Sequence, residues 1–196
     1  CDLEQYDTIV VHVDLFEPQI TITPSSAEVC PDEPVTLTAN NNDLNSWLWT
    51  PGNQTTQSIT VSESLPGSYT YTLTASSFYC IDKQVSASFE VFPQPAATFQ
   101  FDPAEEACTG EEIQFTYSDD PAGKIFNWNF GDGATSNVPN PVHTYVLDGN
   151  YTVSLHVDQY ICSDETNQIV TVNPLPTASF NASNTEGCLP VTVQFN

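Results

Sequence analysis

The sequence is almost without basic residues: in 196 residues it has two lysines, Lys83 and Lys124, and no arginine. Against these stand 25 aspartates and glutamates, so the formal net charge is −23. A surface with this charge repels nucleic acids and anionic membranes and attracts cations. We therefore expect no nucleic-acid partner, and a solvated acidic surface rather than an acidic active site.

Methionine is absent too, and no apolar run approaches the roughly 18 residues that a membrane-spanning helix needs. The first residues do not form a signal peptide, so we expect any secretion signal to have been removed or to lie outside this sequence. The 15 prolines, together with stretches rich in threonine, serine and valine, favour short β-strands joined by turns. These features predict an all-β chain without a membrane span.

Motifs for catalysis are missing as well. The sequence has no HExxH and no CxxC, and His12, His143 and His156 lack the spacing of metal ligands. The most conspicuous short motif, Gly131-Asp132-Gly133, follows alternating aromatic residues and has the composition of a tight turn after a buried strand. Nothing near Asp132 in the sequence supplies a catalytic partner, so we predict that this segment is not an enzyme.

Three pairs of adjacent acidic residues are candidate ligands for calcium. Calcium takes six to eight oxygen ligands from converging loops, and paired carboxylates supply such oxygens. The pairs are Glu105-Glu106, Glu111-Glu112 and Asp119-Asp120. We expect no other cofactor, and calcium binding within or between units remains an alternative.

The six cysteines fall into two series with nearly the same period. Cys1, Cys80 and Cys162 are separated by 80 − 1 = 79 and 162 − 80 = 82 positions. The other three, Cys30, Cys108 and Cys188, are separated by 108 − 30 = 78 and 188 − 108 = 80 positions. A shared period near 80 residues indicates tandem repeats.

The positions of the two cysteine series within the repeat predict which cysteines pair. We expect disulfides Cys30–Cys80 and Cys108–Cys162, which close loops of 80 − 30 = 50 and 162 − 108 = 54 positions. Cys1 and Cys188 would then be unpaired within this segment, with partners in missing repeats. Disulfides of this kind indicate an oxidising compartment, so we expect an extracellular or cell-surface location.

Four segments follow from the repeat: a last strand of a preceding repeat at 1–17, complete sandwiches at 18–92 and 93–173, and the start of a following repeat at 174–196. Both complete units contain short alternating strands without helical periodicity, which is typical of an antiparallel β-sandwich of the immunoglobulin type. We expect Trp49 and Trp128 to cover the cores, and Trp47 to be the better candidate for a partly exposed aromatic residue.

The stretch WNFGDGATSNVPNPVHTYVLDGNYTVSLHV resembles the polycystic-kidney-disease (PKD) domain, and the resemblance covers residues 93–173. Its hallmark turn, the proline-x-histidine-x-tyrosine segment and the glycine-x-tyrosine strand are all present. The residues at motif positions are Trp128, Phe130, Gly131, Asp132, Gly133, Pro141, His143, Tyr145, Gly149 and Tyr151.

The other parts resemble relatives of that domain. Residues 18–92 have Thr50-Pro51-Gly52-Asn53 in place of the motif turn and resemble the immunoglobulin-like repeats that accompany PKD domains, while 174–196 resembles the start of a further PKD unit. The resemblance to large secreted surface adhesins of Bacteroidetes-type bacteria implies an extracellular spacer or adhesion module. The linker prolines Pro93, Pro95, Pro174 and Pro176 restrict bending, so together with the expected disulfides they predict a stiff, disulfide-stapled stalk whose partners are further repeats of the same chain. Three alternatives remain: a module that binds surface polysaccharide or protein, lateral self-association into filaments, and accessory repeats of a secreted hydrolase.

Overall fold

The computed structural model describes residues 19–40, 44–77, 80–104 and 106–179. All regular elements in these ranges are β-strands, so the expected all-β fold is confirmed. In the part of the chain that the structure describes, no helix could cross a membrane. The chain divides into two compact units: unit 1 is Cys1–Pro95 with Gln159–Cys162, and unit 2 is Ala96–Asp158 with Ser163–Asn196.

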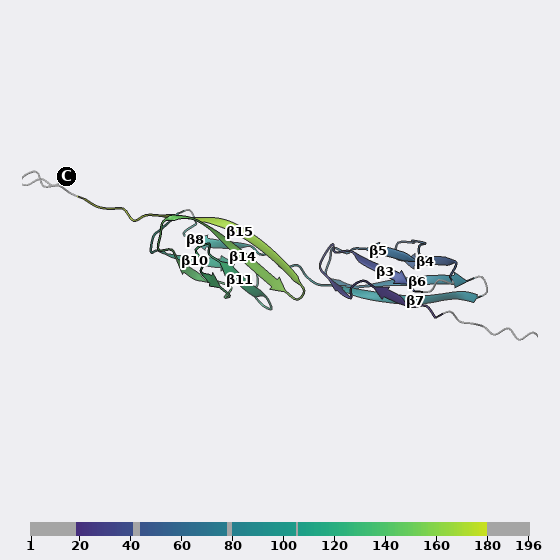
Figure 1. Cartoon of the computed structure of the whole chain (residues 1–196). Helices are drawn as coiled ribbons and strands as arrows, with labels where there is room; N and C mark the ends of the chain where they lie inside the picture. The colour runs from purple at the N-terminus through teal and green to yellow at the C-terminus, as the bar shows by residue number, and fades with distance from the viewer. Residues whose placement is uncertain (1–18, 41–43, 78–79, 105, 180–196) are drawn as a thin grey trace, which may run out of the picture. The chain divides into compact units, whose positions relative to one another are not determined.

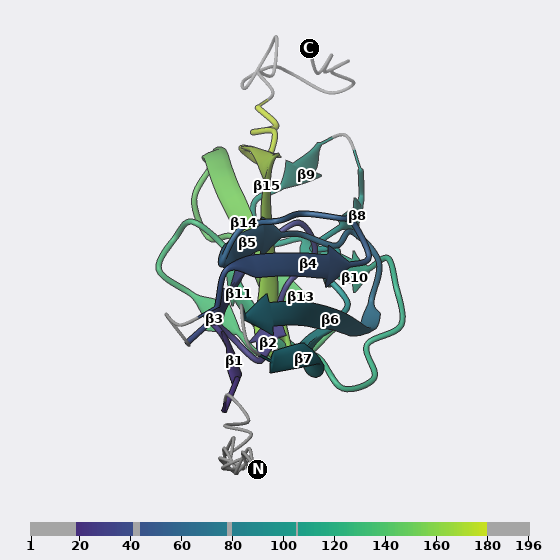
Figure 2. The same ribbon diagram turned by 90° about the vertical axis from the view of Figure 1, so that its right-hand side faces the viewer.

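Unit 1 is a sandwich of two sheets, with strand orders β1-β3-β5 and β2-β7-β6-β4. Figure 2 shows β4, β6 and β7 of the second sheet side by side. Its strands are β1 (Ile22–Pro24), β2 (Glu28–Val29), β3 (Val35–Ala39), β4 (Ser46–Thr50), β5 (Ser58–Val61), β6 (Gly67–Ser77) and β7 (Cys80–Val91).

Unit 2 repeats this plan with strand orders β13-β10-β8 and β12-β11-β14-β15-β9 (Figure 1). The strands are β8 (Phe99–Asp102), β9 (Ala107–Cys108), β10 (Glu112–Tyr117), β11 (Ile125–Asn129), β12 (Thr135–Ser136), β13 (Val142–Thr144), β14 (Gly149–Gln159) and β15 (Cys162–Asn173).

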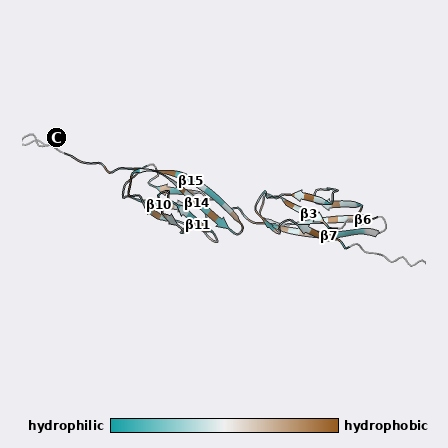
Figure 3. Cartoon of the chain, viewed as in Figure 1, coloured by the Kyte–Doolittle hydropathy of each residue, from teal (hydrophilic) through white to brown (hydrophobic). Residues whose placement is uncertain are grey.

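Each unit has a core of its own because alternate residues of its strands face inward. In β10 the burial alternates strictly, from exposed Glu112 to buried Tyr117, and Figure 3 shows apolar and polar residues mixed along β14 and β15. Both cores centre on a tryptophan with 0% of its surface exposed, Trp49 in unit 1 and Trp128 in unit 2, as the sequence predicts.

The structure pairs Cys30 with Cys162, at a Cα–Cα distance of 5.6 Å, so the predicted pair Cys30–Cys80 is wrong. The reason is strand direction. Cys30 follows β2, which pairs in parallel with the last residues of β7, Val29 opposite Val91. Cys80 opens β7 and therefore lies 11 residues, or about 36 Å, away along the strand. A disulfide needs Cα atoms within about 7 Å.

The predicted pair Cys108–Cys162 is wrong for the same reason. Cys108 lies opposite Asn173, at the end of β15, whereas Cys162 opens that strand. Cys108 has a free thiol. Cys162 lies with the tip of the β14–β15 hairpin, Gln159–Cys162, which belongs to unit 1. Cys1, Cys188 and the expected strand at 1–17 lie outside the described residues.

Candidate functional site

The PKD-type motif of unit 2 begins where β11 leaves the core. Phe126 and Trp128 of this strand are buried, and so is Phe130, which follows it. The indole N–H of Trp128 donates to the backbone oxygen of Val138 at 2.9 Å. Trp128 therefore fills the core and also holds the loop that returns from the motif turn.

The turn itself needs glycine at its first position. Gly131 has φ +83°, and a Cβ added there would lie 2.6 Å from the backbone oxygen of Thr152. Next to it, Asp132 Oδ1 accepts a hydrogen bond from the Ala134 N–H at 2.9 Å. Gly131 thus lets two backbone segments approach closely, and Asp132 closes the turn as an aspartate in a tight turn commonly does.

The second oxygen of Asp132 contacts His143 of β13, with Nε2 and Oδ2 2.8 Å apart. Burial opposes ionisation of Asp132, but the hydrogen bonds from Ala134 and His143 outweigh it and lower the pKa of this carboxyl group. The imidazole of His143 stacks on Phe130, with ring centroids 4.2 Å apart, and meets the Tyr145 ring edge-on at 4.7 Å. His143 is therefore held between aromatic rings with Asp132 as its partner.

Two tyrosines complete this cluster. The Tyr145 hydroxyl is buried and donates to the backbone oxygen of Phe130 at 2.8 Å, and burial raises the pKa of Tyr145. Tyr151 packs against Tyr145, with centroids 4.0 Å apart, and donates to the backbone oxygen of Leu147 at 2.9 Å. That bond is the tyrosine corner of immunoglobulin-like sandwiches.

The motif residues therefore tie three loops of one sandwich together. An aspartate–histidine pair would serve catalysis only with a nucleophile or a bound water within reach, whereas this pair is occupied with a turn and with aromatic packing. The arrangement is a structural one.

Unit 1 has the same supports without the motif turn. The indole N–H of Trp49 donates to the backbone oxygen of Thr56 at 2.8 Å. Tyr69 donates to the backbone oxygen of Leu65, also at 2.8 Å, which makes a second tyrosine corner. Trp47, on the edge strand β4, is partly exposed, as the sequence predicts, and its side chain packs against the core of unit 1.

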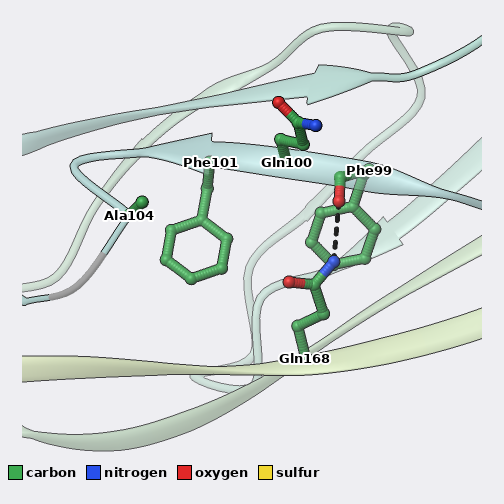
Figure 4. A pocket seen from close by; sticks show the side chains of 5 residues that line it. All are labelled: Phe99, Gln100, Phe101, Ala104 and Gln168. Carbon is green, nitrogen blue, oxygen red and sulfur yellow. Dashed lines mark hydrogen bonds between the residues drawn. The ribbon is translucent and has the colours of Figure 1, made fainter.

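A groove of about 220 Å³ lies between the edge strand β8 and β15 of unit 2. Figure 4 shows Phe101 and Gln168 directed into it, while Gln100 is turned away. The Gln168 side-chain amide donates to the backbone oxygen of Phe99 at 2.7 Å and so covers an edge carbonyl group. Ligand pockets usually have volumes of about 300–1,000 Å³. The groove is therefore an edge closed by Gln168 rather than a site for a small molecule.

The acidic pairs do not come together as a metal site in the part of the chain that is described. No group of three or more His, Cys, Asp and Glu residues there could hold a metal ion. Asp119 is bonded to Lys124 instead, with Nζ and Oδ2 3.3 Å apart. Glu105 lies outside the described residues.

The feature that the sequence did not predict is the contact made by the hairpin tip in unit 1. Cys162 is 1% exposed and bonded to Cys30, and the Tyr160 ring lies 5.0 Å from that of Phe92. The phase of the cysteines did not reveal this pairing, because spacing along the chain does not show which end of a strand a cysteine occupies. In both repeats one cysteine precedes the last long strand and the other lies next to that strand's end, so the two cannot meet within one sandwich.

Comparison with known proteins finds a family match for unit 2. Residues 93–174 match the family model of the PKD domain. A microbial collagenase of Vibrio alginolyticus is 50% identical over 52 residues, which are 24% of this chain and 6% of the collagenase. Collagenase ColA of Bacillus cereus is 52% identical over 52 residues, 24% of this chain and 5% of that protein. The chain thus spans a small fraction of either relative's length.

Among solved structures, one of carbohydrate-binding modules from the β-sandwich superfamily is similar to this chain with 28% identity and a TM-score of 0.39. The similarity covers 49% of this chain and 41% of that one. A likeness at this TM-score says nothing of a ligand for this chain.

Proposed function

Residues 93–174 form a PKD domain, and from this premise we propose that the chain is a non-catalytic spacer segment of a longer extracellular protein. Its function is then to hold other parts of that protein at a distance and to resist extension. The observation that carries this proposal is the disulfide between Cys30 and Cys162.

The disulfide determines which part of the chain carries tension when the two ends are pulled. The two cysteines are separated by 132 residues, and all strands from β3 to β14 lie between them. Tension that enters before Cys30 and leaves after Cys162 crosses the sulfur–sulfur bond and does not reach the strands between them. The intact disulfide therefore protects most of both sandwich cores from being pulled out.

Composition and chemistry support an extracellular setting. A disulfide persists in oxidising compartments outside the cytoplasm. The net charge of −23 keeps the chain soluble, because like-charged modules repel one another within the roughly 8 Å screening length of physiological salt. PKD-type motif residues that serve packing rather than chemistry suit a module whose role is mechanical.

Single-molecule pulling from the two ends of the chain tests the proposal. Reduction should lengthen the fully extended chain by about 440–480 Å, which is 132 residues at about 3.3–3.6 Å each. Cys162→Ser should behave like the reduced protein without any reductant, whereas Cys108→Ser should keep the short, oxidised length. An oxidised chain that extends to its full length would overturn the proposal.

The type of parent protein is a separate question. The repeats and the acidic surface favour a multi-repeat surface adhesin, and the collagenase relatives favour accessory repeats of a secreted hydrolase. We propose the adhesin stalk, in which this segment itself binds no substrate. Co-sedimentation with insoluble collagen discriminates between them: the stalk should stay in solution, and binding that saturates would favour the hydrolase.

A further inference from the structure

The turn after β2 in unit 1 and the turn after β9 in unit 2 have the same construction. The Cys30 N–H donates to Glu33 Oε2 at 2.9 Å, and the Cys108 N–H donates to Glu111 Oε2 at 2.8 Å. In return the glutamate N–H groups donate to the cysteine carbonyl oxygens, at 3.2 and 3.1 Å. We call these the Cys30 turn (Cys30–Glu33) and the Cys108 turn (Cys108–Glu111).

The surroundings of the two turns also match. The third residue of each turn has positive φ, 63° at Asp32 and 82° at Gly110. Its N–H donates at 2.9 Å to the loop before the tyrosine-corner strand, to Glu63 in one case and to Tyr145 in the other. Both cysteines therefore occupy the same place at the end of their own sandwich.

The Cys30 turn is occupied. It holds the hairpin tip Gln159–Cys162, which belongs to unit 1, through the disulfide to Cys162. The hairpin tip adds two contacts to Phe92, which follows β7: the Tyr160 ring lies 5.0 Å from the Phe92 ring, and the Cys162 sulfur lies 3.9 Å from the Phe92 carbonyl oxygen. Within unit 1 this turn thus works as a receptor for a hairpin cysteine and the aromatic residue before it.

The Cys108 turn offers the same features without an occupant. Its thiol is free and half-buried. The loop that accepts the Gly110 N–H continues into Val146 and Leu147, which are 84% and 68% exposed. Two exposed apolar side chains, in the loop that is hydrogen-bonded to the Cys108 turn, make a surface that a partner would cover favourably.

We propose that the Cys108 turn is a second receptor of this kind, and that it binds the Cys80 hairpin of a second copy of this chain through a disulfide. The inference goes beyond the proposed function and does not require it. It rests on the internal comparison: the same turn, in the same chain, holds such a hairpin in unit 1.

The chain also carries a hairpin of the required type. Cys80 opens β7 after the β6–β7 turn, as Cys162 opens β15 after the β14–β15 turn. Its preceding residues, Phe78 and Tyr79, are apolar or aromatic like Tyr160 and Ile161. A second copy of this chain is therefore the occupant, with Cys80 of one copy bonded to Cys108 of the other.

The bond forms by thiol–disulfide exchange with a low-molecular-weight disulfide such as glutathione disulfide. The Cys80 thiolate attacks it and releases one glutathione. The Cys108 thiolate then attacks the Cys80 sulfur of the mixed disulfide and releases the second. Two thiols are oxidised and one glutathione disulfide is reduced to two thiols, so electrons and protons balance.

The test uses two full-length variants that both retain Cys30 and Cys162. One keeps Cys108 and carries Cys1→Ser, Cys80→Ser and Cys188→Ser; the other keeps Cys80 and carries Cys1→Ser, Cys108→Ser and Cys188→Ser. After equilibration of the mixture in a glutathione redox buffer, non-reducing gels and peptide mapping give the dimers formed. We expect the Cys80–Cys108 heterodimer to exceed either homodimer by at least about tenfold, equivalent to ~1.4 kcal/mol of docking.

A matched variant separates docking from random oxidation. Val146→Asp with Leu147→Asp leaves Cys108 in place and alters only exposed side chains, and it should reduce the excess of heterodimer to the statistical ratio. Near-UV circular dichroism checks that this variant is folded. No heterodimer, or a statistical mixture of dimers from the unaltered pair, would overturn the inference.

Discussion

At the scale of single residues, the motif turn depends on one position that only glycine can occupy. Gly131 combines φ +83° with an approach to the Thr152 backbone that leaves no room for a Cβ. Gly133, two residues on, has φ +97°, but a Cβ added there would meet nothing within 4 Å. At Gly131 a side chain would both clash with the backbone and strain φ, whereas at Gly133 it would only strain φ.

We expect Gly131→Ala to destabilise unit 2 by about 3 kcal/mol, because strain in φ and a clash with backbone add together. The matched change Gly133→Ala should cost about 1 kcal/mol, from φ alone. Urea denaturation followed by tryptophan fluorescence measures both. Equal losses for the two variants would show that the close approach to Thr152 does not matter.

Asp132 gives a prediction about pH. Its pKa in the folded unit is lowered from 3.8, since the hydrogen bonds from Ala134 and His143 outweigh burial. A carboxyl group with a lowered folded pKa stabilises the fold above its unfolded pKa, and that stability is lost as pH falls through the folded value. Asp132→Asn keeps an oxygen for Ala134 but cannot titrate. Its stability should fall less than that of the wild type between about pH 5 and 2.5, and parallel stability curves would contradict this.

At the scale of elements, the long strands were predictable and the shortest ones were not. The alternation in Glu112–Tyr117 and the sequence LDGNYTVSL each point to a strand from local pattern alone. β2, β9 and β12 have two residues each, too few for any period to be seen. Because β2 and β9 fix where Cys30 and Cys108 lie, the positions of these cysteines, and therefore their partners, were not predictable from the local pattern.

The contribution of the Cys108 turn to the stability of unit 2 should be measurable. Glu111 Oε2 accepts from the Cys108 N–H at 2.8 Å, so Glu111→Ala leaves that N–H group to water and should cost unit 2 about 1 kcal/mol. Glu112→Ala, at the next exposed position, is the control and should change stability by less than about 0.5 kcal/mol. Both follow from chemical denaturation. If the two variants lose the same stability, the turn does not depend on this bond.

At the scale of the whole molecule, the period of the cysteines predicted the tandem repeats, but it did not predict which cysteines pair. A spacing near 80 residues identifies repeats, and two sandwich cores are indeed present. Spacing along the chain does not say which end of a strand a cysteine occupies, and in a sandwich the two ends of β7 or β15 are tens of ångströms apart. The parallel registers Val29–Val91 and Cys108–Asn173 place Cys30 at the end of β7 far from Cys80, and Cys108 at the end of β15 far from Cys162. The structure pairs Cys30 with Cys162 instead.

The Cys30–Cys162 bond should also dominate stability. In the chain-entropy model, a closed loop of 132 residues restricts the unfolded chain by an amount worth about 5 kcal/mol, and typical measured values are about 2–4 kcal/mol. Cys30→Ser and Cys162→Ser should therefore lower the thermal transition by similar amounts in calorimetry, and the double variant should lower it no further, because the two residues act through one bond. Cys108→Ser removes a thiol without opening any loop and should leave the transition unchanged. Additive losses in the double variant, or a Cys30-containing peptide linked to one containing Cys80 in a non-reducing digest, would contradict this pairing.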